Sequence, residues 1–426
     1  RHGAQGVTPI PSVESTRRTQ DGRKINSAAR GFWTVTLVFV AFSFLLKLPT
    51  WNFLHNRGDE PIYWQLSRNL ARHGQYNLAG TPILKKLSLH AYDRKLFHHP
   101  PLYPVLLAPF ALWGSMKSAV LVSWASHALC IIAVALILRS WLQNSAEGFD
   151  EWSACFWLPL LGVSADPLLT LMSTKLWTDG LLTGLIALSL SLFFIASRSG
   201  RQRTVLFSAG VVLGLALLTK IVAVLAVAIA AAILWFQSDR NWKSFAKSAA
   251  LGIAPAALLL LPWLVVFYRE YGELTPNWLR PDEWTLKHIP FVAAAAERPI
   301  SYYLIKTGMI QPLFFLGLAF ALNRTALSNL TYRTGLVWCL VFLAGVTALS
   351  NASVYQMRYL GPMVPGLYVM FGGLLQCAHR RRPPLVLAGL LCITYAAAGG
   401  ALYLLVADHH EMYSFLEWGG FVSFEP

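Results

Sequence analysis

Residues 57–104 read RGDEPIYWQLSRNLARHGQYNLAGTPILKKLSLHAYDRKLFHHPPLYP and form the longest polar interruption in a very apolar chain. The stretch opens with an acidic pair, Asp59-Glu60, and closes with His98-His99 followed by two prolines. Because proline fixes its own φ and keeps the preceding residue extended, the imidazoles are presented from a stiff segment. We interpret residues 55–117 as a large first outer loop that carries chemistry at a membrane surface.

Composition places the chain among membrane proteins with several spans. Of 426 residues, 55% are hydrophobic and only 13% are charged, and the mean hydropathy is +0.49. A soluble domain carries about 25% charged residues. The formal charge of +15 is spread between apolar segments, so we attribute it to anionic lipid and to the positive-inside rule rather than to nucleic acid. The five cysteines lie in apolar segments without CxxC spacing, which favours buried free thiols.

A helical span needs roughly 17–25 apolar residues. The sequence therefore predicts an all-α polytopic membrane protein, a bundle of about eleven transmembrane helices. The expected spans are 32–51, 118–142, 152–172, 179–196, 204–219, 221–236, 248–268, 301–322, 334–350, 359–377 and 384–406.

The short loops predict the orientation of these spans. With a basic N-terminal tail (1–31) in the cytoplasm, every compact basic cluster falls on the cytoplasmic side. The first span (32–54) then leads to the first outer loop, in which residues 101–115 are expected to form an interfacial helix. Spans in 118–268 and 301–406 flank a second long outer loop (269–300), and residues 407–426 form an outer tail. We expect an integral protein of the bacterial inner (plasma) membrane, with its active site on the outer face.

The polar residues assigned to the outer face are the candidate site, and each also has a simpler interpretation. Asp59 and Glu60 start a helical pattern, where acidic residues are favoured as caps, but a carboxylate there can also take a proton from an acceptor hydroxyl. Asp179 begins another span and can cap it. Lys220 can snorkel to the interface and Arg358 can act as an anchor. As a set on one face, these cations and the histidine pair can bind a phosphate.

The histidines also raise the question of a metal. His98-His99 share the first loop with His55, His73 and His90, but their spacing matches no defined ligand pattern. The sequence therefore assigns no metal ligand and leaves the need for a divalent cation open.

Five segments in order carry a resemblance to a known group of enzymes. They are DEPIYWQLSRNLARHGQY (59–76), HHPPLYPVLLAPFALWG (98–114), KLWTDGLLTGLIAL (175–188), VVLGLALLTK (211–220) and RYLGPMVPG (358–366). In this respect the chain resembles the GT-C glycosyltransferases of the protein O-mannosyltransferase-like and aminoarabinose-transferase-like group.

The resemblance implies an enzyme that transfers a sugar from a polyprenyl-phosphate carrier to a protein, lipid or glycan acceptor on the outer face. It implies that Asp59 is the catalytic carboxylate with Glu60 beside it, that Asp179 is a second acidic position, and that Lys220 and Arg358-Tyr359 line the carrier pocket. The family usually has lysine before the Pro-Pro pair, where this chain has His99. The full set expected to contact substrate is Tyr63, His98, His99, Tyr103, Lys175, Asp179, Lys220, Arg358 and Tyr359.

The chemistry expected from this resemblance is inverting transfer. Asp59 would deprotonate the acceptor hydroxyl, and His99, Lys220 and Arg358 would stabilise the leaving lipid phosphate. The alternatives are a secondary transporter, for which Asp166 next to Pro167 is the one favourable feature, and a non-catalytic membrane scaffold.

Overall fold

The structure is a computed structural model, and it describes residues 13–52, 59–81, 95–142, 153–197, 201–238, 241–272, 303–304, 307–308, 311–349, 357–378 and 382–406. Within these ranges every regular element is a helix and no β-strand occurs. The all-α prediction is therefore confirmed for the part of the chain that is described.

The site is positioned by helices from the first loop, the bundle and the C-terminal part. The first loop contains α2 (Asp59–His73) and α4 (Leu102–Trp113). The bundle then includes α5 (Met116–Leu142), α6 (Ala154–Ser164), α7 (Pro167–Ser173), α8 (Thr178–Ala196), α9 (Gln202–Leu217), α10 (Val224–Gln237) and α11 (Trp242–Tyr271). The C-terminal part has α15 (Leu313–Leu318), α16 (Arg324–Ser328), α17 (Leu330–Leu349), the 3₁₀ helix η5 (Met357–Met363), α18 (Val364–Cys377) and α19 (Arg382–Val406). The first described helix is α1 (Val13–Lys47).

Six of these helices are long and apolar enough to cross a membrane, and the number rises to seven if the bent pair α6 and α7 is one span. Further apolar helices that are shorter cover Gln202–Leu217, Ile221–Gln237 and Pro383–Gly399. These elements coincide with ten of the expected spans, so the membrane fold is confirmed, whereas the total of about eleven spans stays a prediction.

The span expected over 301–322 is not a continuous helix in its described part. Helix α15 ends at Leu318, and the chain turns through residues 319–322 before Asn323 caps α16. Tight turn bonds replace the helical ones, from the Phe320 amide to Gly317 at 3.1 Å and from the Ala321 amide to Leu318 at 2.9 Å, and the Tyr332 hydroxyl also donates to the Gly317 carbonyl at 2.9 Å. Asn323 then accepts from the amides of Thr325 and Ala326, which begins a new helix. The predicted span is wrong for residues 311–322.

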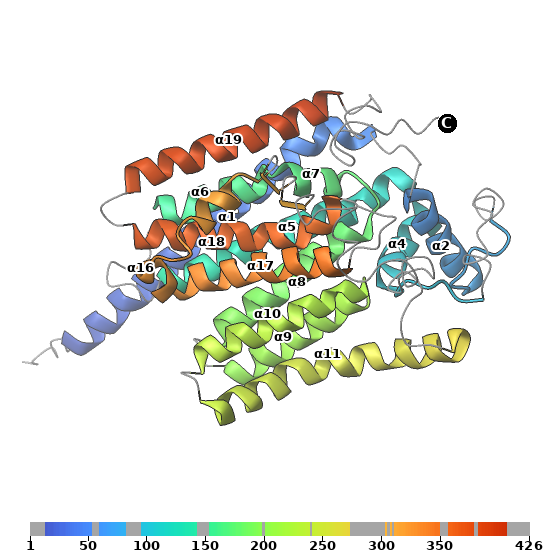
Figure 1. The fold of residues 1–426 in the computed structure, drawn as a ribbon, viewed down its shortest axis with the longest axis horizontal. Helices are drawn as coiled ribbons and strands as arrows, with labels where there is room; N and C mark the ends of the chain where they lie inside the picture. The colour runs from blue at the N-terminus through green and yellow to red at the C-terminus, as the bar shows by residue number, and fades with distance from the viewer. Residues whose placement is uncertain are drawn as a thin grey trace, which may run out of the picture.

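The first-loop helices α2 and α4 lie at one end of the bundle (Figure 1). Helices α2 and α4 pack on each other, and α8 lies between α5 and α9. Helix α11 runs along α9 and reaches the same end, where the Tyr271 hydroxyl donates to the Leu96 carbonyl at 2.5 Å. Close approach of α9 and α11 requires Gly210, because a Cβ there would collide with the Gly252 carbonyl. We call this end, marked by α2 and α4, the α2–α4 end.

Candidate active site

The centre of the site is an ion pair between two elements far apart in the sequence. Asp59 is the first residue of α2, and Arg358 lies in η5. The Arg358 guanidinium donates to Asp59 Oδ2 at 2.6 Å. The Asp59 side chain remains 38% exposed while that of Arg358 is only 7% exposed. A partly exposed carboxylate is therefore paired with a buried cation.

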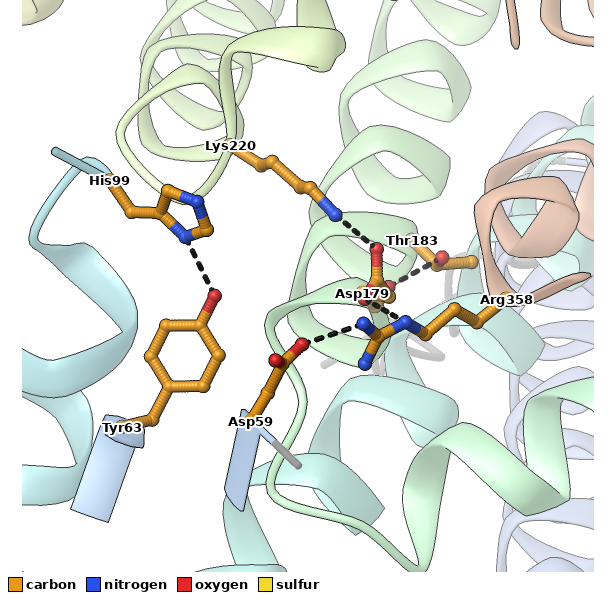
Figure 2. A network of polar contacts seen from close by, with 7 residues as sticks. All are labelled: Asp59, Tyr63, His99, Asp179, Thr183, Lys220 and Arg358. Atoms are coloured by element: carbon orange, nitrogen blue, oxygen red, sulfur yellow. Dashed lines mark hydrogen bonds and ion pairs between the residues drawn. The ribbon is translucent and has the colours of Figure 1, made fainter. Parts of the chain in front are cut away.

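A second carboxylate holds two cations together (Figure 2). Asp179, in the first turn of α8, accepts from Lys220 Nζ at 2.8 Å and lies 3.5 Å from Arg358 Nε. Its side chain is 3% exposed. Asp59, Asp179, Lys220 and Arg358 carry two negative and two positive charges, so the network is balanced without a ligand. Buried charges need such pairing because removal of water is costly.

Aromatic rings flank the two cations. The Arg358 guanidinium lies 4.5 Å from the Trp177 ring centre and 5.8 Å from that of Tyr359. Lys220 Nζ lies 4.4 Å from the Tyr359 ring centre. These cation–π contacts restrict where the cations point. Trp177 is a site residue that the sequence did not single out, although its place two residues before Asp179 was a usable signal.

Glu60 does not share the surroundings of Asp59. Its carboxylate is buried, and Oε1 accepts from the Leu176 amide at 3.4 Å. Lys175 lies close by, and burial lowers the pKa of its ammonium while the Glu60 charge raises it. Successive helical residues point about 100° apart, so the two neighbouring carboxylates diverge. The structure places Glu60 against the segment that leads into α8 and away from the half-exposed face of Asp59.

A second pair of side chains borders the ionic network. The Tyr63 hydroxyl and His99 Nδ1 lie 2.8 Å apart, and both side chains lie beside the network (Figure 2). The Tyr76 hydroxyl donates to the carbonyls of His99 and Pro100 at 3.0 and 3.2 Å, which fixes the backbone of this segment. The amide of Leu102 donates to the Leu218 carbonyl at 3.0 Å, so the segment lies next to Lys220.

The histidines do not provide the positive charge expected of them. Loss of water lowers the pKa of His98 to about 4, and it lowers the pKa of His99 well below the usual range. For His99 the nearby charges of Lys220 and Arg358 act in the same direction. A neutral His99 can form hydrogen bonds with a phosphate but adds no charge. The lowered pKa of His99 favours the neutral ring, and the expected contact of His99 with a phosphate stays a prediction.

The remaining candidates are Tyr103, His98 and Tyr359. Tyr103 is fully buried, packs edge-on against Tyr63 with ring centres 5.5 Å apart, and has its hydroxyl 3.4 Å from Ser123 Oγ. The His98 ring lies 4.3 Å from that of His99 and 4.6 Å from Phe97. Tyr103 and His98 therefore support Tyr63 and His99, whereas Tyr359 borders the cations directly.

Metal binding has no prepared site in the described residues. They contain no group of three or more His, Cys, Asp or Glu side chains that could hold a metal ion. His55 and His90 lie outside the described ranges.

Asp166, the residue that favoured a transporter, is fully hydrogen-bonded. It is 1% exposed and accepts from the amides of Leu168 and Leu169 and from the side chains of Tyr368 and Gln311. Four donors use the whole capacity of a carboxylate. Its burial therefore has an explanation within the protein.

Two solved structures have a similar fold. ArnT from Cupriavidus metallidurans, solved bound to undecaprenyl phosphate, aligns with a TM-score of 0.59 and 19% identity over 89% of this chain and 68% of that one. The archaeal oligosaccharyltransferase AglB from Archaeoglobus fulgidus, solved with an inhibitory peptide and a dolichol-phosphate, aligns with a TM-score of 0.54 and 15% identity over 88% of this chain and 55% of that one. At these identities the likeness establishes the fold.

Sequence comparison establishes the family. No curated protein sequence matches the chain. The model of glycosyltransferase family 87 matches residues 97–350, more than half of the chain, and includes His98, Asp179 and Lys220. The GT-C resemblance is thereby confirmed, and the chain is a membrane protein that belongs to glycosyltransferase family 87.

Proposed function

We propose that this glycosyltransferase moves a sugar from a polyprenyl-phosphate carrier to an acceptor hydroxyl at the α2–α4 end, with inversion at the anomeric carbon. The observation that carries the proposal is the convergence of Asp59, Asp179, Lys220 and Arg358 from four separate elements. A lipid phosphate as donor is supported by the undecaprenyl phosphate and dolichol-phosphate bound to ArnT and AglB.

Asp59 is the proposed base. It takes the proton of the acceptor hydroxyl, whose oxygen attacks the anomeric carbon of the donor. The bond from that carbon to the phosphate oxygen breaks, and the lipid phosphate leaves with the electron pair. Attack opposite to the leaving group inverts the anomeric centre.

Lys220 and Arg358 are the proposed stabilisers of the leaving phosphate. Buried cations that are already in place act strongly on charge that develops in the transition state. Arg358 has five N–H donors, so it can retain Asp59 while it also binds a phosphate oxygen. Asp179 is proposed to hold both cations at the required spacing, since it lies within 2.8 Å of Lys220 and 3.5 Å of Arg358.

Tyr63 and His99 are proposed to contact the donor on the side opposite to Asp179 and Arg358. If Tyr63 donates to His99 Nδ1, the neutral ring carries its proton on Nε2 and can donate to a phosphate or sugar oxygen. Glu60 and Lys175 are proposed to hold the segment between α7 and α8 rather than to take part in the chemistry. The acceptor can be a protein, a lipid or a glycan, and the product of the assay below would identify it.

The test is transfer of label from polyprenyl-phosphate sugars in membranes that contain wild type or Asp59→Asn. We expect wild type to release label from the lipid. The rate of transfer by Asp59→Asn should be at least about 100-fold lower, the lower end of what a positioned base contributes. Glu270→Gln is the matched control, because it makes the same change at a carboxylate near the end of α11. Activity of Asp59→Asn equal to wild type would exclude Asp59 as the base.

A further inference from the structure

The bend between α6 and α7 is built around Asp166. Pro167 has no N–H, so it cannot bond to the Val163 carbonyl as a continuous helix would require. His127 Nε2 lies 2.8 Å from that carbonyl and takes the place of the missing donor. Asp166 Oδ1 accepts from the amides of Leu168 and Leu169, each at 3.0 Å, and so begins α7. The two helices meet at 45°.

The second oxygen of Asp166 reaches another part of the fold. Oδ2 accepts from the Tyr368 hydroxyl of α18 at 2.9 Å and from the side-chain amide of Gln311. One carboxylate therefore ties the start of α7 to α18. Removal of one partner of such a buried network leaves groups unsatisfied and the geometry undetermined.

These two tied elements carry opposite sides of the ionic network. Helix α7, about 10 Å long for its seven residues, leads directly to Trp177 and Asp179. Helix α18 directly follows η5, which carries Arg358. The two sides also pack directly, since a Cβ on Gly361 of η5 would lie 2.6 Å from Met172 Sδ of α7.

We infer that Asp166 is a positioning residue for sugar transfer: through Tyr368 it sets the spacing between Asp179 on one side and Arg358 on the other. Asp166 touches no reacting atom, and it acts on the cations through α7 and α18. The inference rests on the proposed function, because it assumes that the ionic network is where transfer occurs. A displacement of about 1 Å at a catalytic group can cost about 100-fold in rate.

The test compares Tyr368→Phe and Asp166→Asn with wild type in membranes. Tyr368→Phe removes one hydroxyl, whereas Asp166→Asn keeps Oδ1 for the cap and replaces the Oδ2 acceptor with a donor. We expect kcat to fall about 10- to 100-fold in both variants, with KM for the lipid donor changed less than about threefold. Because both changes cut the same link, the double variant should be no worse than Asp166→Asn.

Tyr332→Phe is the matched control, since it also removes a buried tyrosine hydroxyl, which bonds to Gly317 and not to α7. A readout that is independent of turnover is hydrogen exchange of the amides over 174–179, which should quicken in Tyr368→Phe and not in Tyr332→Phe. Unchanged kcat and exchange in folded Tyr368→Phe, or equal losses in Tyr332→Phe, would overturn the inference. Absence of transfer by wild type would instead count against the proposed function, and the exchange comparison would still decide the role of Asp166.

Discussion

The contacts of Arg358 require an arginine rather than a lysine at the centre of the site. Its guanidinium pairs with Asp59 at 2.6 Å and Asp179 at 3.5 Å while lying against Trp177. A lysine ammonium is a point charge without this planar, forked geometry. We expect Arg358→Lys to lower kcat/KM about 100-fold, measured with the labelled donor. Arg269→Lys, at an exposed arginine of α11, should leave kcat/KM unchanged.

His98 predicts a pH dependence of stability. Its pKa is about 4 in the folded protein and 6.5 ordinarily, so between these values the unfolded chain binds a proton that the folded chain does not. The contribution of His98 to the free energy of unfolding is therefore fully present above about pH 6.5. It declines by up to about 3 kcal/mol as the pH falls to 4. Thermal unfolding at pH 7 and pH 5 should show a smaller drop in Tm for His98→Gln than for wild type. In the control His73→Gln, at an exposed histidine that ends α2, the drop in Tm should equal that of wild type.

Among the helices, η5 carries Arg358 and must pack closely against α7 and α8 for Arg358 to reach Asp59 and Asp179. Gly361 permits this, because a Cβ there would meet Met172 Sδ at 2.6 Å and Thr183 Oγ1 at 3.1 Å. We expect Gly361→Ala to push η5 outward and lower kcat about tenfold, by displacing the cation it carries. Truncation of the opposing side chain, in Gly361→Ala with Met172→Ala, should restore part of the loss.

The control for this change is Gly399→Ala in α19, where an added Cβ has no atom within 4 Å. It should retain wild-type activity, since alanine is at least as compatible with a helix as glycine. Equal activity of Gly361→Ala and Gly399→Ala would mean that the fit of η5 on α7 does not govern catalysis.

For the whole molecule, the distribution of apolar and basic surface agrees with a protein that crosses a membrane. Leu258 and Leu391 are 68% and 63% exposed, which suits contact with lipid and would be unfavourable in water. Basic residues such as Arg201 and Lys243 begin α9 and α11, at the far ends of these helices from the α2–α4 end. The predicted orientation places those far ends in the cytoplasm.

Labelling with a membrane-impermeant thiol reagent tests this orientation. Lys95 is exposed near Tyr271 at the end of α11, and Lys243 is exposed at its start, about 45 Å away along its 30 residues. We expect Lys95→Cys to react in intact cells and Lys243→Cys to react only after permeabilisation. Reaction in the reverse order would invert the topology and place the site in the cytoplasm.

The class of fold and most of the candidate site could be predicted from the amino-acid sequence. Hydropathy and the positions of basic loops are local properties, so they predicted the spans and gathered Asp59, Asp179, Lys220 and Arg358 on one face. Those four residues meet in the structure. The resemblance to a GT-C family supplied their proposed roles.

The direction of each side chain and the charge that it carries could not be predicted from the sequence, because both depend on the packing of distant segments. Glu60 faces the segment before α8 because successive helical residues diverge, and His99 is neutral because its neighbours exclude water and add positive charge. The Gly317 carbonyl in the last turn of α15 accepts from the hydroxyl of Tyr332, a residue of another helix. Orientation, desolvation and long-range hydrogen bonds arise from contacts between distant segments, which no local pattern of residues contains.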